Sequence, residues 1–137
     1  MRIFVDTSGL LAVLDASDRW HPATRQTWDE LLTTGAELVT TSYVLVELYA
    51  LAQRRLGMEA VRTLYTDIQP VLTVLWVDEA MHRAGVEALL SSGRRGPSLV
   101  DCVSFVAMRQ EGIVDALALD AHFAAQGFRC HPEVSVE

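Results

Sequence analysis

The sequence contains no lysine, and this absence argues against several classes of function. All eleven basic residues are arginines. A P-loop nucleotide site requires a lysine that reaches the phosphates, and Schiff-base catalysis requires a lysine amine. Phosphoaspartyl sites generally use a lysine as well. We therefore do not expect the protein to belong to any of these classes.

Cysteine and long apolar runs are also scarce. The two cysteines, Cys102 and Cys130, lie far apart and lack metal-site spacing, so we expect reduced, buried thiols. No apolar run reaches the roughly 18–20 residues that a membrane-spanning helix requires. The first residues lack the basic-then-apolar layout of a secretory signal. These features predict a cytoplasmic protein without membrane contact.

Acidic charge is in excess over basic charge. The net charge of −7 argues against a protein that binds nucleic acid by broad neutralisation of its phosphates. It leaves room for an enzyme whose acidic side chains bind metal ions that then meet a phosphate. The 137 residues, half of them apolar, fit one domain with a substantial core.

Strand-like and helix-like segments alternate along the chain. The pattern predicts strands over 2–6, 37–42, 71–77, 113–119 and 128–131, and helices over 7–15, 20–34, 43–56, 58–68, 79–91, 98–111 and 121–126. Alternation of this kind indicates a parallel sheet with helices on both faces. In such sheets ligands bind beyond the carboxyl ends of the strands, so the residues that follow each strand are the candidates for a site.

Two aspartates follow predicted strands. Asp6 follows the first strand, and Asp120 follows the strand over 113–119. Each could simply cap the next helix, because an Asp side chain accepts hydrogen bonds from free backbone N–H groups there. Both would lie at one edge of the sheet, however, where two carboxylates repel each other unless a cation lies between them.

Two further acids lie on predicted helices. Glu47 lies near an apolar face of the helix over 43–56, where an ionised side chain needs a partner. Asp101 stands three residues after Ser98, which is the spacing of a capping box. Asp101 also shares a helix face with Ser104, so its carboxylate points toward the junction of core and sheet edge. Hard divalent cations prefer oxygen ligands of this kind.

Four stretches carry a resemblance to a known family: "FVDTSGLLAVLDASDRWH", "TTSYVLVELYAL", "SLVDCVSFVAM" and "ALALDAHFAAQGF". In this order and at these spacings they resemble PIN domains, and specifically the VapC-type ribonuclease toxins of prokaryotic toxin–antitoxin pairs. The resemblance extends from Arg2 to about Cys130. It implies a single domain over residues 1–137, with a three-layer α/β/α sandwich around a mainly parallel sheet of four to five strands.

The resemblance also implies a Mg²⁺ or Mn²⁺ site. Its metal-binding and catalytic acids map onto Asp6, Glu47, Asp101 and Asp120. Asp6 and Asp101 are the strongest candidates for direct metal ligands. The hydroxyl residues expected to support the site are Thr7, Ser8 and Ser104.

The implied activity is metal-dependent hydrolysis of RNA phosphodiester bonds by the toxin of a type II toxin–antitoxin pair. The implied partners are the RNA substrate, a cognate antitoxin protein and a second copy of the chain in a homodimer. Two alternatives remain: a catalytically silent PIN-fold binding module, which the intact set of acids disfavours, and a metal-dependent nuclease that acts on DNA, which the small size disfavours.

Several polar residues near these motifs have simpler interpretations. Arg94 and Arg95 precede the helix of Asp101, where a solvated loop and a contact to substrate phosphate are equally consistent with the sequence. His122 suits a structural position at a helix start. Arg54 and Arg55 close a helix, where cations favour the negative end of the helix dipole.

Overall fold

The sheet has five strands, and all of them run parallel. A computed structural model describes residues 1–93 and 95–134 of the chain. Its strand order is β3-β2-β1-β4-β5. The strands are β1 (Arg2–Val5), β2 (Glu37–Thr41), β3 (Leu72–Leu75), β4 (Asp115–Leu117) and β5 (Arg129–His131). The predicted α/β architecture is therefore confirmed, with the sheet at the upper end of the expected strand number.

Helices connect every pair of consecutive strands. They are α1 (Thr7–Leu14), α2 (His21–Thr33), α3 (Ser42–Arg55), α4 (Met58–Thr63), α5 (Glu79–Ser91), α6 (Leu99–Glu111) and α7 (Ala121–Ala125). The helix predicted over 58–68 is α-helical only to Thr63 and continues as a π-helical turn, η1 (Leu64–Ile68), and a 3₁₀ turn, η2 (Gln69–Val71). No helix among the described residues is both long enough and apolar enough to cross a membrane.

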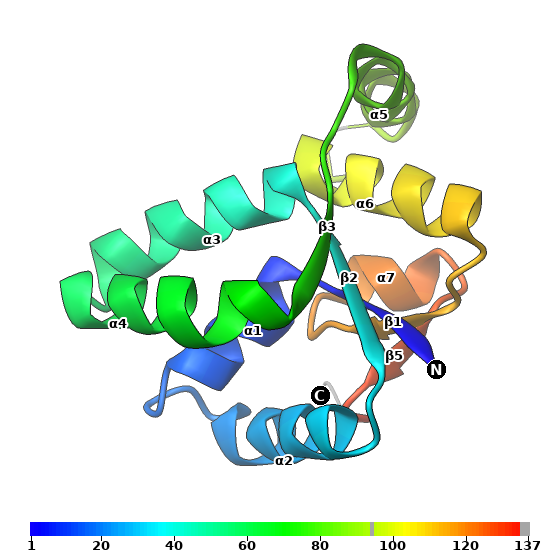
Figure 1. The fold of residues 1–137 in the computed structure, drawn as a ribbon. Helices are drawn as coiled ribbons and strands as arrows, with labels where there is room; N and C mark the ends of the chain where they lie inside the picture. The colour runs from blue at the N-terminus through cyan, green and yellow to red at the C-terminus, as the bar shows by residue number, and fades with distance from the viewer. Residues whose placement is uncertain (94, 135–137) are drawn as a thin grey trace.

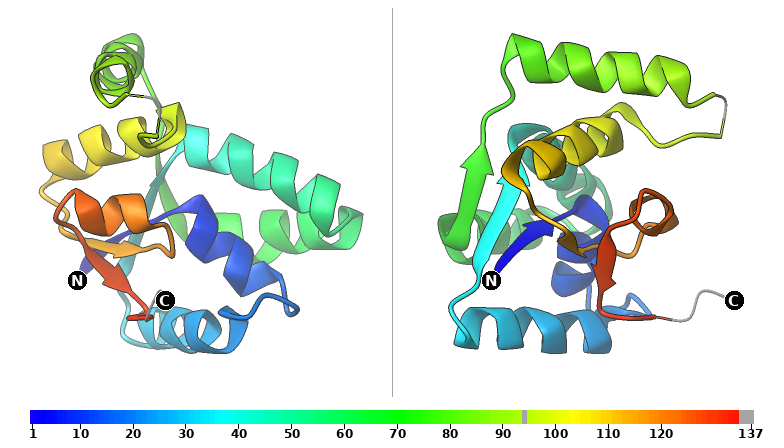
Figure 2. Two further views of the ribbon diagram at one scale, coloured as in Figure 1. Left: turned by 180° about the vertical axis from the view of Figure 1, so that it is seen from behind. Right: turned by 90° about the vertical axis from the view of Figure 1, so that its right-hand side faces the viewer.

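The helices form layers on both sides of the sheet (Figure 1). In the right-hand view of Figure 2, α6 lies above the strands and α2 below them, while α5 covers α6 from outside. The central strand β1 is enclosed by these layers, and Ile3, Phe4 and Val5 have no exposed surface. Burial of each such side chain stabilises the fold by about 1.5–3 kcal/mol.

Aromatic side chains join β1 to the C-terminal third of the chain. Phe105 of α6 meets Phe123 of α7 edge to face, with ring centroids 4.9 Å apart. Phe4 stacks on Phe123 at 6.3 Å, and Phe128 lies 5.8 Å from Phe105. Such pairs add about 0.5–1.5 kcal/mol beyond the burial of their area. This cluster holds α6 and α7 against the centre of the sheet.

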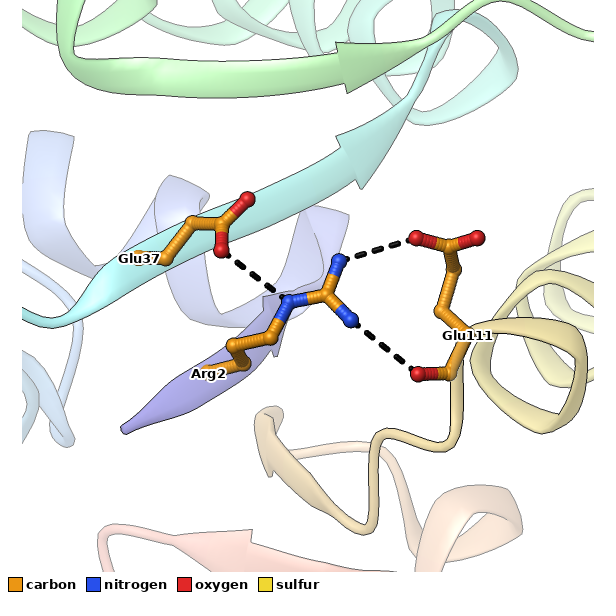
Figure 3. Close-up of polar contacts among 3 residues, drawn as sticks. All are labelled: Arg2, Glu37 and Glu111. Carbon is orange, nitrogen blue, oxygen red and sulfur yellow. Dashed lines mark hydrogen bonds and ion pairs between the residues drawn. The ribbon is translucent and has the colours of Figure 1, made fainter.

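An arginine binds together the amino ends of the strands (Figure 3). Nε of Arg2 donates to Oε2 of Glu37 at 3.0 Å, and its guanidinium donates to Oε1 of Glu111 at 2.8 Å and to the Glu111 carbonyl at 3.0 Å. The three side chains link β1, β2 and the end of α6. All three are partly exposed, so each ion pair contributes little to stability.

The order in which successive strands are added to the sheet reverses at β1. From β1 the chain moves outward to β2 and β3, and then returns through α5 and α6 to β4 on the other side of β1. The carboxyl ends of β1 and β4 therefore flank the point where strand order reverses. A crevice at this point is the usual place for a ligand in an open parallel sheet.

Candidate active site

Three aspartates converge at the carboxyl ends of β1 and β4. Asp6 directly follows β1, Asp120 follows β4 by three residues, and Asp101 lies in the first turn of α6. Each offers a carboxylate oxygen, and these oxygens all lie within 4.8 Å of one another. Asp6 is only 2% exposed and Asp101 8%. The fold thus assembles three acids that lie far apart in the sequence.

Asp6 and Asp120 both cap helices, as the simpler interpretation of each predicted. Oδ2 of Asp6 accepts from the backbone N–H of Ser8 at 3.2 Å at the start of α1. Oδ1 of Asp120 accepts from the backbone N–H of His122 at 2.9 Å at the start of α7. A cap occupies one oxygen of each carboxylate, so the second oxygen can face the other acids.

Asp101 takes part in the predicted capping box. Its Oδ2 accepts from the backbone N–H of Ser98 at 3.2 Å, and its own N–H donates to Oγ of Ser98 at 3.1 Å. All three acids therefore lie at helix N-termini, where the positive end of the helix dipole stabilises negative charge. This placement partly offsets their mutual repulsion.

Ser8 ties Asp6 to the loop that leads to Asp120. Its hydroxyl donates to Oδ2 of Asp6 at 2.7 Å and accepts from the backbone N–H of Leu119 at 3.0 Å. Oδ1 of Asp6, by contrast, is buried and has no hydrogen-bond partner in the described part of the chain, and the same holds for Oγ1 of Thr7. An unpartnered buried oxygen is costly and calls for a ligand.

The carboxylates of Asp6 and Asp101 are held in the protonated form more strongly than usual. Burial raises the pKa of Asp6 to about 7; the nearby charge of Asp101 adds to this, and the hydrogen bond from Ser8 partly offsets it. Burial also raises the pKa of Asp101, and the charges of Asp120 and Glu47 add to the effect. Like charges at such distances require a proton or a cation between them.

The acids open into a cavity of about 470 Å³. Half-buried Glu47 lies on its wall, outside the group of three converging oxygens. Besides these four acids, the cavity is lined by Thr7, Ser8, Leu11, Leu51, Arg55, Ser98 and His122. The structure therefore brings all four predicted acids to one cavity, with Glu47 set apart from the other three.

The remaining predicted residues lie elsewhere. Ser104 is fully buried, does not line the cavity, and donates its hydroxyl to the carbonyl of Val100 at 2.8 Å on its own helix. Arg95 is exposed in the turn that leads to Ser98 and is not part of the cavity wall. Arg94 lies outside the described residues.

Two cavity residues were given structural roles from the sequence alone. Arg55 lies in the last turn of its helix, as expected, and it also lines the cavity together with Glu47 and Leu51. Their spacing of four residues places all three on one face of α3, and this periodicity is a signal that could have identified Arg55. His122 also lines the wall, and its signal was its position two residues after Asp120.

The site suits a hard divalent cation. The converging groups are carboxylates, and one buried oxygen among them has no partner in the described chain. Mg²⁺ and related ions take oxygen ligands, commonly one or two carboxylates together with water. Asp6, Asp101 and Asp120 are the residues positioned to hold such an ion.

Comparison with known proteins agrees with this geometry. The model of the family described as PIN domain matches residues 3–128. The chain belongs to the PIN domain family. This PIN domain is 34% identical, over 127 residues, to the curated 23S rRNA-specific endonuclease VapC20 of Mycobacterium tuberculosis, covering 92% of the chain and 95% of that protein.

Solved structures show the same fold. The crystal structure of M. tuberculosis VapC20, described as a sarcin-ricin loop cleaving toxin, superposes with a TM-score of 0.82 at 33% identity and covers 92% of this PIN domain and 95% of that chain. Two more distant structures share the fold alone. VapBC2 of Rickettsia felis, bound to a promoter DNA fragment, has a TM-score of 0.69 at 13% identity, with 96% and 98% of the chains covered. DNA-bound VapBC of Salmonella typhimurium has a TM-score of 0.64 at 17% identity, with 96% and 97% covered.

Proposed function

We propose that this PIN domain is a Mg²⁺- or Mn²⁺-dependent endoribonuclease and the toxin of a type II toxin–antitoxin pair. The observation that carries the proposal is the cluster of three aspartates with an unpartnered buried oxygen. It occurs in a chain that is 34% identical to a 23S rRNA-specific endonuclease over 92% of its length. RNA is therefore the proposed substrate, and 23S rRNA is the first RNA to test.

The proposed roles follow from where the side chains lie. Asp6, Asp101 and Asp120 would hold the ion, and Glu47 would complete the acidic set from the wall of the same cavity. A bound divalent ion supplies polarisation of a phosphate oxygen and a lowered pKa for coordinated water. Ser8 would orient Asp6 through its hydroxyl, which binds Oδ2 and leaves Oδ1 of Asp6 without a partner in the described chain.

Thr7, Ser104, Arg94 and Arg95 have supporting roles in the proposal. Thr7 adds a buried hydroxyl without a described partner beside the acids. Ser104 would act indirectly, because its hydroxyl binds the backbone of Val100 in the helix turn that carries Asp101. Arg95 lies in the turn that leads to Ser98 at the cavity wall, and contact with substrate phosphate is the proposed role of Arg95 and of Arg94, which precedes it in the sequence.

The proposed protein partners are a cognate antitoxin and a second copy of the chain. The antitoxin is inferred from the relationship to VapC20 and to toxins solved within VapBC assemblies. The homodimer is inferred from the family resemblance. It is supported by large apolar side chains on the surface, among them Trp76 and Leu90, which are 73% and 79% exposed.

The decisive test compares the wild type with Asp101→Asn and with Asp29→Asn. Asp29 is an exposed acid on α2 far from the cluster, so its variant makes the same charge change outside the site. With Mn²⁺ present we expect the wild type and Asp29→Asn to cleave 23S rRNA, and Asp101→Asn to lose at least about 100-fold in rate, because loss of even a supporting group at a metal site costs 10–100-fold. Chelation of metal should abolish cleavage, and added Mn²⁺ should restore it.

Other outcomes would decide against the proposal. Equal cleavage by the wild type and Asp101→Asn would remove Asp101 from the catalytic set. Cleavage of matched DNA but not RNA would favour the DNA nuclease. RNA binding without cleavage at any metal concentration would favour a silent binding module. Mapping of new RNA 5′ ends after induced expression would show whether the same cuts arise in cells.

A further inference from the structure

Arg55 occupies an unusual position for an arginine of this protein. It lies in the last turn of α3, exposed to solvent, and lines the cavity that holds Asp6, Asp101 and Asp120. Among the described residues that line this cavity, it is the only arginine or lysine. An RNA strand that enters the cavity therefore meets one arginine among the described residues of its wall.

The guanidinium of Arg55 has donors available. Most described arginines are engaged, as in the ion pairs of Arg2, Arg62 and Arg129, whereas no ion pair or side-chain hydrogen bond joins Arg55 to a described residue. Its charge does reach Asp15, whose pKa is lowered mainly by hydrogen bonds from Ser17 and further by the charges of His21 and Arg55. This distant influence leaves the planar group of Arg55 free to bind a ligand.

The charge of the cavity makes such a residue necessary for an anionic substrate. Four carboxylates surround the space, and the chain as a whole is acidic and has no lysine. A cation held by the acids would attract the phosphate at the reacting centre, but the neighbouring phosphates of the strand would still face acidic walls. Arginine suits such a phosphate, because its guanidinium can donate two parallel hydrogen bonds.

The geometry of α3 sets where this contact lies. Glu47, Leu51 and Arg55 follow one another at intervals of four residues on the face of the cavity. Eight residues of α-helix span about 12 Å, so Arg55 lies well along the cavity from Glu47. We propose that Arg55 binds a backbone phosphate of the RNA that flanks the scissile phosphate, and thereby positions the strand across the acids. This assignment rests on the proposed function.

Arg54 provides a matched control. It is the preceding residue on the same turn of α3, it is also exposed, and it does not line the cavity. Successive side chains on a helix point about 100° apart, so Arg54 is directed away from the cavity face. The variants Arg55→Gln and Arg54→Gln therefore change the net charge equally, and only the first removes the proposed contact.

The experiment measures cleavage and binding of one RNA by the full chain. With Mn²⁺, we expect Arg55→Gln to raise KM about tenfold or more and to leave kcat within twofold, because a hydrogen bond to a charged group is lost from substrate and transition state alike. The slope of log affinity against log salt should fall by about 0.7, the value for one phosphate contact on a single strand. Arg55→Lys should recover part of the loss, and Arg54→Gln should resemble the wild type.

A second readout separates this inference from the proposed function. RNA binding is measured in Asp101→Asn, which is expected not to cleave, with and without Arg55→Gln; loss of binding in the double variant supports the phosphate contact whether or not the wild type cleaves RNA. Unchanged KM and unchanged binding in Arg55→Gln would overturn it while leaving the nuclease intact. Equal losses in Arg54→Gln and Arg55→Gln, or a fall in kcat alone, would also overturn it. An unchanged melting temperature confirms that the variants are folded.

Discussion

Asp6 caps a helix and is at the same time a proposed metal ligand. Its Oδ2 accepts from the backbone and hydroxyl of Ser8, while its Oδ1 is buried without a described partner. The hydrogen bonds from Ser8 hold Oδ2, and Oδ1 stays available to a ligand. A similar arrangement applies to Asp120, which caps α7, and to Asp101, which completes the capping box of α6 with Ser98. Local capping therefore pre-organises the acids before any ligand binds.

The raised pKa of Asp6 predicts a particular pH dependence of stability in metal-free protein. An unfolded Asp ionises near pH 4, whereas burial raises the pKa of Asp6 to about 7 in the folded protein. Between these values the folded state binds more protons than the unfolded state, so the free energy of unfolding falls as pH rises. The loss attributable to Asp6 should reach up to about 4 kcal/mol at pH 7 and then level off, since three pH units correspond to about that energy.

Urea unfolding in the presence of a chelator, from pH 4 to 8, checks this expectation. The difference in free energy of unfolding between Asp6→Asn and the wild type should grow in favour of the variant up to about pH 7, because Asn cannot ionise. Asp29→Asn, which alters an exposed acid, should follow the wild type. A constant difference between Asp6→Asn and the wild type across this range would contradict the raised pKa.

At the scale of elements, the site depends on a close contact between α1 and β4. A Cβ atom at Gly9 of α1 would collide with the carbonyl group of Leu117 at the end of β4. This approach brings the start of α1 near the loop after β4, where Ser8 accepts from the backbone N–H of Leu119. Packing therefore requires a glycine at position 9. The sequence alone did not indicate this requirement, because the close approach of α1 to β4 appears only in the fold.

Gly9 and Gly85 should respond differently to replacement by alanine. At Gly85 of α5 the added Cβ would meet the side chain of Val103, whereas at Gly9 it would meet the backbone of Leu117. We expect Gly9→Ala to lower the free energy of unfolding by about 2–3 kcal/mol, in the range of overpacked cores. Gly85→Ala should lower it less, because displacing one side chain disturbs the fold less than displacing the backbone of a central strand.

Urea unfolding of the two variants at one pH makes this comparison. The rise in melting temperature on addition of Mn²⁺ should also be smaller for Gly9→Ala than for Gly85→Ala, because only Gly9 lies beside the acids. A ligand that binds the folded state raises its stability in proportion to affinity, so this shift reports the integrity of the site. Equal destabilisation and equal Mn²⁺ shifts would show that α1 can move away from β4 without consequence.

At the scale of the whole molecule, the two ends of the sheet differ in the charged groups that they carry. The amino ends of β1 and β2 are tied to α6 by Arg2 with its two glutamates (Figure 3). The carboxyl ends of β1 and β4 carry the acids. Favourable ion pairs thus lie at one end and uncompensated like charges at the other. The repulsion among the acids is therefore confined to one end of the sheet, where a bound cation would relieve it.

Association of two chains is the remaining expectation at this scale. The mass of one chain is 15.1 kDa, and light scattering after size exclusion should give about twice this value at micromolar concentration. Exposed apolar side chains such as Trp76 and Leu90 favour a contact that persists in high salt, because screening weakens charge pairs rather than apolar burial. A monomer at every concentration would contradict the homodimer.

Local rules account for the features that could be read from the sequence. Periodicity and capping residues act over a few neighbouring residues, so the strand before Asp6, the capping box of Ser98 and Asp101, and the end of α6 at Gly112 were all predictable. The main error of secondary structure lies after Thr63, where the expected α-helix widens into a π-helical turn. The four acids were identified by their places after strands and on helix faces, together with the family resemblance.

The distances between helices and strands could not be predicted from these local rules. That Asp120 joins Asp6 and Asp101 while Glu47 stays apart depends on strand order and on where α3 and α6 cross the sheet. The approach of Gly9 to Leu117 and the presence of Arg55 on the cavity wall have the same origin. Helix and strand formation depend on neighbours along the chain, whereas a site depends on side chains from four elements that meet only when the core has packed.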